Sequence, residues 1–237
     1  VKSELSSFML GLKEVLPSYM QGKSGVERYV QYNKWAIDSS NSIADYMAKR
    51  YPDQKFFITV NAGAADLAAH NFDEERYIEV VEKLDACLLQ LFETCQRNNL
   101  SLIITSDHGM KFSTAEVKGG HSPEKYADTM ESQRIPLIIY SPVIESRIII
   151  ETHEQKDIAP TVLSLLDIVD RPIYCDGKAI QLRSYVNLKV EAEEPSEIRV
   201  SRGQILVGKT IASNVTFYGL DSDSYTIDVN GMVKQVD

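Results

Sequence analysis

The sequence predicts an α/β fold with a mostly parallel sheet and helices on both faces, followed by a small C-terminal β module. Short runs rich in Val, Ile and Leu alternate with long amphipathic segments, which is typical of a parallel sheet covered by helices. After about residue 182 the pattern changes to short strand-like pieces separated by turn residues. We therefore expect an α/β domain over residues 1–188 and a β module over residues 189–237.

The first sixty residues predict two helices and a strand. Residues 4–20 and 25–50 read as helices, and in the second the apolar residues recur so as to keep one broad stripe apolar. The run KFFITV at 55–60 is short, β-branched and aromatic, so it predicts a buried strand.

The middle of the chain continues the alternation. A helix is predicted over 74–97, where apolar residues mark one face and two asparagines follow. Strands are predicted at 100–105 (LSLIIT) and 135–141 (IPLIIYS), and a helix from Asp157 to about Ile168, with Asp157 as its cap. In open parallel sheets, ligands gather at the carboxyl ends of the strands.

The C-terminal part predicts a linker and five short strands. The linker is expected over 190–195, a polar run that ends at a proline. The strands are expected at 197–200, 204–207, 214–218, 225–229 and 232–236. Asn230-Gly231 is a strong hairpin signal between the last two.

Composition narrows the class of partner. An apolar content of 43% and a charged content of 25% are ordinary for a globular protein with a core. The net charge of −9 argues against nucleic acid or anionic membrane as main partner, although bound cations would still admit an anionic substrate. The sequence contains no run of eighteen apolar residues, so it predicts no membrane span. Few cysteines slightly favour the cytoplasm, whereas such β modules often decorate exported enzymes, so the compartment stays open.

Three of the four histidines lie in short motifs that suggest a metal centre. These are Asp66-x3-His70, Ser106-Asp107-His108-Gly109, and Gly119-Gly120-His121. Carboxylate oxygen and neutral imidazole nitrogen are ligands that zinc and manganese accept. Taken alone, Asp66 and His70 are more often a surface pair, and the combination of motifs is what points to two ions acting on phosphate esters.

The same residues carry a family resemblance. The series AADLAAH, ITSDHGM, GGHSP, PLIIYSP, DIAPTVLSLL and CDGKAI resembles the carboxyl-terminal half of the alkaline phosphatase superfamily. That superfamily includes nucleotide pyrophosphatase/phosphodiesterases, cofactor-independent phosphoglycerate mutases, sulfatases and phosphoethanolamine transferases. The resemblance covers roughly residues 50–180, and the segments GGHSPE and PLIIYSP favour the phosphodiesterase and phosphoethanolamine-transferase branches over the mutases.

The resemblance implies a two-ion site of which this chain holds one part. Asp66, His70 and His121 match the ligands of one ion, and Asp107 and His108 match two ligands of the other. The family's remaining Asp and its nucleophilic Ser or Thr have no counterpart here. The candidate serines lie on the expected helices with no Asp-Gly strand end nearby, and they are Ser3, Ser6, Ser7, Ser39, Ser40 and Ser42. The chain opens on Val1, which together with this gap is typical of a fragment of a longer enzyme.

The function we expect is that of a metal-dependent hydrolase or transferase acting on small, anionic phosphate mono- or diesters. Two divalent ions, zinc or manganese, are the expected cofactors, and the nucleophile is expected outside this chain. Two alternatives stay open. One is a non-catalytic binding or assembly module with an incomplete metal site, and the other is sulfatase or phosphoglycerate mutase activity.

Overall fold

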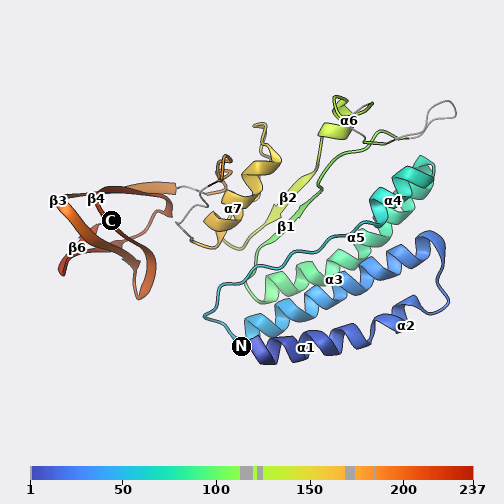
Figure 1. Cartoon of the computed structure of the whole chain (residues 1–237), viewed down its shortest axis with the longest axis horizontal. Helices are drawn as coiled ribbons and strands as arrows, with labels where there is room; N and C mark the ends of the chain where they lie inside the picture. Colours follow the sequence, from blue (N-terminus) through green and yellow to red (C-terminus); the bar gives the residue numbers. More distant parts are fainter. Residues whose placement is uncertain (1, 113–119, 122–124, 169–173, 184, 237) are drawn as a thin grey trace. The chain divides into compact units, whose positions relative to one another are not determined.

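The computed structural model describes residues 2–112, 120–121, 125–168, 174–183 and 185–236. The chain divides into two compact units, Val1–Pro142 and Val143–Asp237 (Figure 1). Within the described residues, no helix is both long enough and apolar enough to cross a lipid bilayer. The two units are considered separately below.

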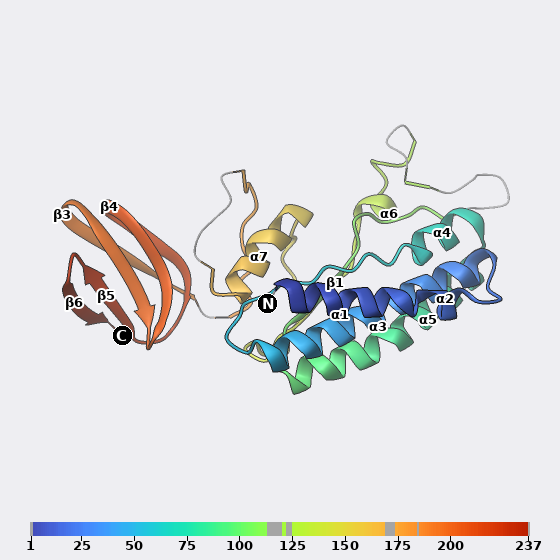
Figure 2. The same ribbon diagram turned by 60° about the horizontal axis from the view of Figure 1, so that its bottom comes forward.

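Long helices build the core of the first unit. Helices α3 (Gly25–Arg50), α4 (Ala64–Asn71) and α5 (Glu74–Arg97) contact one another, and α3 and α5 run side by side in both views (Figures 1 and 2). Their apolar faces meet in one core, formed by Val30, Ile37, Ala64, Ala68, Val80, Leu84, Leu91 and Cys95. The predicted helix over 74–97 is confirmed, and Asp73 caps it by accepting a hydrogen bond from the Arg76 backbone N–H at 3.0 Å.

The helix predicted over 4–20 is two helices. They are α1 (Lys2–Glu14) and α2 (Leu16–Met20), and Pro17 lies in the first turn of α2. Proline has no N–H and its ring would clash with the carbonyl of Lys13 in a continuous helix, so the chain breaks before it. The indole Nε1–H of Trp35 on α3 donates to the carbonyl of Leu12 at 2.9 Å and holds α1 against α3.

The mostly parallel sheet that we predicted is not seen among the described residues of this unit. Strands β1 (Leu102–Thr105) and β2 (Leu137–Tyr140) pair antiparallel, with Leu102 opposite Tyr140. Their connection, residues 106–136, is long enough for a parallel crossover, but its described part contains only the four-residue helix α6 (Met130–Gln133) and not the longer helix that usually carries such a crossover. Leu102 and Tyr140 contact the helical core, so this sheet is joined to α3, α4 and α5.

The strand predicted at 55–60 is also wrong. The segment KFFITV forms neither helix nor strand, and Phe57 is 62% exposed. A short apolar run becomes a strand only where a neighbouring strand offers it a free edge. Among the described strands, none pairs with this segment.

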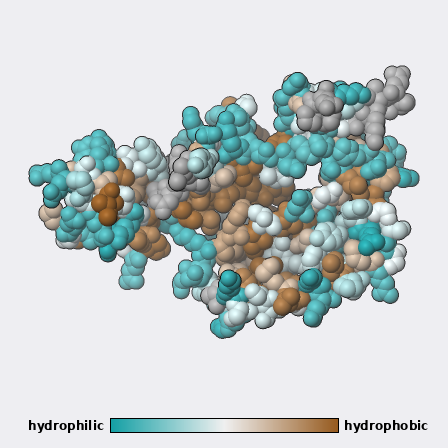
Figure 3. Space-filling model, in the orientation of Figure 1, coloured by the Kyte–Doolittle hydropathy of each residue, from teal (hydrophilic) through white to brown (hydrophobic). Residues whose placement is uncertain are grey.

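The second unit is one antiparallel sheet preceded by helical turns. The 3₁₀ turn η1 (Gln155–Asp157) and helix α7 (Ile158–Leu165) precede strands β3 (Tyr185–Arg202), β4 (Ile205–Asp221), β5 (Tyr225–Val229) and β6 (Met232–Val236). The strand order is β4-β3-β5-β6. In the view of Figure 3 most of the sheet's visible surface is hydrophilic, as expected of a sheet with one solvated face.

The predicted strands at 225–229 and 232–236 are confirmed. Those predicted at 197–200 and 214–218 are parts of the longer strands β3 and β4, and the one predicted at 204–207 begins one residue late, since β4 starts at Ile205. The expected linker at 190–195 is wrong, because it lies inside β3. Its polar residues Glu191, Glu193 and Glu194 are exposed, and the β3–β4 register shifts between Glu191 and Ser196.

Asp167 ties α7 to the sheet. Its carboxylate accepts from Arg183 at 2.7 Å and lies 3.3 Å from a guanidinium nitrogen of Arg202 on β3. These contacts link the end of α7 to the sheet within the second unit. The division into domains of residues 1–188 and 189–237 stays a prediction.

Candidate metal centre

Helix α4 carries the first two predicted ligands. Asp66 and His70 are one helical turn apart, and His70 Nε2 lies 3.5 Å from Asp66 Oδ1. The start of α4 is fixed from α3, because the backbone N–H of Ala64 donates to Asn33 Oδ1 at 2.7 Å. Asn33 is 3% exposed, so this bond is shielded from water and holds the helix in place.

The turn after β1 places His108. Gly109 donates its backbone N–H to the Ser132 carbonyl at 2.8 Å, and a Cβ on Gly109 would lie 2.0 Å from the Glu131 carbonyl oxygen. Only glycine allows this close approach to α6. His108 Nδ1 lies 2.8 Å from the Gly109 carbonyl, which can only accept a hydrogen bond. Nδ1 therefore carries the proton, and the lone pair of Nε2 is available to a metal ion.

A backbone bridge places His121 beside His108. Lys111 N–H donates to the Gly120 carbonyl at 3.1 Å, and Gly120 N–H donates back to the Lys111 carbonyl at 2.8 Å. The rings of His108 and His121 consequently stack, with centroids 3.6 Å apart and planes at 16°. The rings of Phe112 and Tyr77 of α5 meet edge-on with centroids 4.8 Å apart, which anchors the chain next to Lys111 to the helical core.

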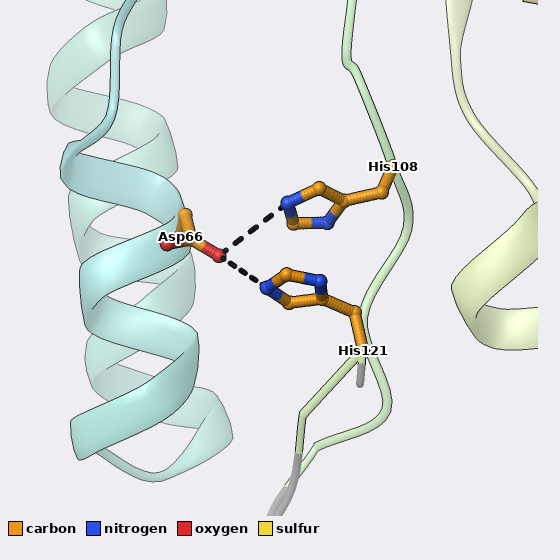
Figure 4. A group of neighbouring side chains, drawn as sticks. All are labelled: Asp66, His108 and His121. Atoms are coloured by element: carbon orange, nitrogen blue, oxygen red, sulfur yellow. Dashed lines mark ion pairs between the residues drawn. The ribbon is translucent and has the colours of Figure 1, made fainter. Parts of the chain in front are cut away.

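Both histidine rings face the carboxylate on α4 (Figure 4). Nε2 of His108 and Nε2 of His121 lie 3.8 Å and 3.6 Å from Asp66 Oδ1. The three candidate ligand atoms lie within 4.8 Å of one another. A zinc ion bound at about 2.0–2.2 Å from each ligand would hold such atoms roughly 3.3 Å apart. A small closing movement would therefore let Asp66, His108 and His121 hold one ion.

The other two predicted ligands flank this group. The rings of His70 and His121 have centroids 5.1 Å apart, so His70 is next to the three. Asp107 Oδ1 lies 3.7 Å from His108 Nε2, and the Asp107 side chain is 80% exposed. The structure thus brings Asp66, His70, Asp107, His108 and His121 into one place. The tightest group combines residues that the resemblance divides between two ions, and their assignment as ligands stays a prediction.

The fourth histidine is in the other compact unit of the chain. His153 belongs to the second unit, with Nδ1 3.6 Å from Asp157 Oδ2. Asp157 also accepts from the backbone N–H groups of Glu154 at 3.0 Å and Lys178 at 2.8 Å. These bonds hold the pKa of the Asp157 carboxyl below its usual value, with the neighbouring His153 adding to the effect. Asp157 is therefore a structural acceptor as well as the residue that precedes α7.

The sequence did not single out Asn33 or the backbone contacts of Gly109. A signal for Asn33 was present, because it interrupts the apolar stripe of α3 between Val30 and Ile37. A buried amide in such a stripe usually has a specific hydrogen-bond partner. The collision that excludes a side chain at Gly109 involves residues more than twenty positions away, so no local pattern reveals it.

The model of the metalloenzyme superfamily matches residues 9–169, which is more than half of the chain. The chain belongs to the metalloenzyme superfamily. The predicted membership of the alkaline phosphatase group of proteins is therefore confirmed, while the identity and the number of metal ions stay open.

Curated relatives of this chain are named 2,3-bisphosphoglycerate-independent phosphoglycerate mutases. That of Gracilaria tenuistipitata var. liui is 31% identical over 113 residues, 47% of this chain and 21% of the relative. That of Rhodopirellula baltica is 30% identical over 131 residues, which are 54% of this chain and 23% of the relative. That of Clostridium perfringens is 27% identical over 129 residues, which are 54% of this chain and 24% of the relative. No solved structure matches the chain significantly.

The chain spans less than a quarter of the length of these three relatives. Their names belong to the mutase branch and give no support to the phosphodiesterase branch that the segments GGHSPE and PLIIYSP favoured.

Proposed function

We propose that the protein is part of a metal-dependent enzyme that transfers phosphoryl groups of small phosphate esters. The observation that carries this proposal is the convergence of Asp66, His108 and His121, whose candidate ligand atoms lie within 4.8 Å of one another. Membership of the metalloenzyme superfamily supports it. The expected cofactors are two divalent ions, zinc or manganese, and the expected substrate is a small phosphate ester.

The chain's own residues have defined parts in this proposal. Asp66 offers a carboxylate oxygen, and His108 and His121 offer Nε2 atoms on one side of it. His70 and Asp107 lie where they could complete this ion's shell or contribute to a second. Bound ions of this kind polarise phosphate oxygens and lower the pKa of a nucleophile. The Gly109 carbonyl holds the proton of His108 on Nδ1 and so keeps Nε2 directed at Asp66.

Two reactions fit this chemistry. Hydrolysis or transfer of phosphate mono- or diesters follows from the site residues, and mutase activity is the second candidate because the relatives above are named phosphoglycerate mutases. In a mutase the phosphoryl group would move within one substrate, and Asp66, His108 and His121 would hold an ion that polarises its oxygens. Assays of the full-length enzyme with p-nitrophenyl phosphate, bis-p-nitrophenyl phosphate and 3-phosphoglycerate would separate the reactions.

Metal titration of the tag-free chain tests the proposal. Isothermal titration with Mn²⁺ and Zn²⁺ should show saturable binding, and Asp66→Asn and His121→Asn should each weaken it about 100-fold, since loss of even an outer-shell partner costs 10- to 100-fold. His153→Asn is the matched control, because it removes a histidine of the other unit. Equal losses in all three variants, or no binding by the wild type, would overturn the proposal.

A further inference from the structure

One turn of the first unit contacts both loops that carry histidines of the metal centre. It comprises residues 126–132, including the start of α6, and we call it the α6 turn. At its end the carbonyl of Ser132 accepts the Gly109 N–H at 2.8 Å, directly after His108. Ser132 is 7% exposed, so water competes little for this bond. The end of the α6 turn therefore holds the His108 loop.

The beginning of the same turn holds the His121 loop. The ring of Tyr126 is buried and lies against Gly120, where an added Cβ would be 3.5 Å from the ring. The same Cβ would be 3.8 Å from Cε1 of His70, so the ring lies close to a third imidazole of the centre. His121 follows Gly120 directly and faces Asp66 (Figure 4). The position of the Tyr126 ring therefore affects where His121 lies.

Thr129 connects the two ends of the turn. It stands immediately before α6, where a threonine hydroxyl commonly accepts from the first backbone N–H groups of a helix. Here the hydroxyl instead donates to the Tyr126 carbonyl at 2.8 Å, and its oxygen lies 3.0 Å from Ser132 Oγ. One half-buried side chain thus joins the residue that contacts Gly120 to the residue that holds Gly109.

We propose that Thr129 is a positioning residue of the metal centre. Through the α6 turn it keeps Nε2 of His108 and Nε2 of His121 at 3.8 Å and 3.6 Å from Asp66 Oδ1. The backbone bridge between the two loops joins them to each other, whereas the α6 turn holds both of them to one anchor. This inference rests on the proposed function, since it concerns the ligands of the same ion.

Two substitutions at Thr129 test this role by titration of the tag-free 237-residue chain with Co²⁺. Thr129→Val keeps the branched shape but removes the hydroxyl, so the Tyr126 carbonyl and Ser132 Oγ lose one partner each. It should weaken Co²⁺ binding about tenfold, the scale on which loss of an outer partner reduces metal affinity. Thr129→Ser restores a hydroxyl at the same position and should keep the affinity within about threefold of the wild type.

The visible spectrum of bound Co²⁺ separates positioning from stability. Its d–d bands depend on the number and arrangement of the ligands, so a displaced imidazole changes them, whereas a loss of stability alone does not. Thr129→Val should therefore alter the bands, and Thr129→Ser should restore the spectrum of the wild type.

Thr94→Val is the matched control. It removes a hydroxyl that accepts from Arg97 at 2.7 Å, in the same unit. Thr94 lies roughly 26 Å along α5 from Tyr77, the residue that contacts Phe112 near the metal centre. Both valine variants should lower the melting temperature by about 2–4 °C, but only Thr129→Val should change the affinity for Co²⁺ and the spectrum.

Ser132→Ala repeats the test with a smaller change and decides the matter if Thr129→Val does not fold. It keeps the carbonyl that holds Gly109 and should weaken Co²⁺ binding about fivefold. Wild-type affinity and spectrum in the variants of the α6 turn, or an equal loss of affinity in Thr94→Val, would overturn this inference and leave the proposed function standing. No Co²⁺ binding by the wild type would overturn both.

Discussion

Gly109 decides where His108 lies, because no side chain fits at position 109. A Cβ there would lie 2.0 Å from the Glu131 carbonyl oxygen and 2.6 Å from that of Arg134. At Gly120, in the other histidine loop, a Cβ would meet the Tyr126 ring at 3.5 Å, an ordinary contact. The two glycines therefore differ in how much the candidate metal centre depends on them.

Gly109→Ala should weaken Mn²⁺ binding at least about tenfold, the scale of damage that follows when a ligand's support is lost. The alanine would push the turn away from α6 and move His108 away from Asp66. Gly120→Ala is the control and should change the affinity less than about threefold, the context-dependent scatter of such small contacts. Titration calorimetry on both variants measures this, and equal affinities would show that the turn does not set the position of His108.

Asp157 gives a prediction about pH. Its folded pKa lies below the ordinary 3.8 because the ionised carboxylate accepts two backbone hydrogen bonds. A lowered pKa means that the ionised form stabilises the fold above about pH 4, and that this contribution is lost as the pH falls through the folded pKa. Asp157→Ala should therefore lower the free energy of unfolding by about 1–3 kcal/mol at pH 7.

The difference between Asp157→Ala and the wild type should shrink steadily below pH 4. Urea unfolding at pH 7, 5 and 3, followed by circular dichroism, measures it. Asp176→Ala, at an exposed carboxylate nearby, should have little effect at any of these pH values. A constant difference from pH 7 to pH 3 would show that the charge on Asp157 does not matter.

At the residue scale the sequence was informative about chemistry and less so about geometry. The types and motifs of Asp66, His70, Asp107, His108 and His121 were visible, and the structure gathers all five. Which nitrogen faces which oxygen depends on contacts such as the Lys111–Gly120 bridge. Those contacts join positions that are not related by the repeat of a helix or a strand, so the sequence pattern does not reveal them.

Among the elements, helix α5 was predictable and the segment 55–60 was not. A helix satisfies its own backbone, so the period of its apolar residues and the Asp73 cap are enough to define Glu74–Arg97. A strand depends on a partner that its own residues do not encode. The same reason explains why the polar run 190–195 belongs to β3, since pairing with β4 overrides its composition.

Helix α4 depends on one buried hydrogen bond, which gives a prediction at the scale of an element. Asn33→Ala would leave the Ala64 N–H buried without its acceptor and should cost about 1–3 kcal/mol of stability. It should also weaken Mn²⁺ binding, because Asp66 and His70 lie on α4. Asn71→Ala, an exposed change at the end of α4, is the control and should affect neither property. Thermal unfolding and metal titration measure the two properties. Equal losses in the Asn33→Ala and Asn71→Ala variants would argue against this role of Asn33.

At the scale of the whole molecule, we expect residues 1–237 to have little catalytic activity. The hydroxyls of Ser6, Ser7, Ser40 and Ser42 donate to carbonyls of their own helices, as expected of structural serines. Residues 1–237 should therefore bind one ion well and hydrolyse p-nitrophenyl phosphate at least a thousandfold below the ~10 s⁻¹ common among enzymes. The hydrolysis rate of the wild type minus that of an Asp66→Asn control measures this. A rate near 10 s⁻¹ from residues 1–237 would contradict the prediction.

Helix α3 has a consequence that reaches beyond the metal centre. It is 26 residues long, about 39 Å, and it carries Asn33 in its first half and the basic residues Lys49 and Arg50 in its last turn. One stiff rod thus sets the alignment of two separate groups of side chains. A kink in its middle, as from a proline at Ser39, would disturb both groups together, so redesign of either end must leave the rod straight.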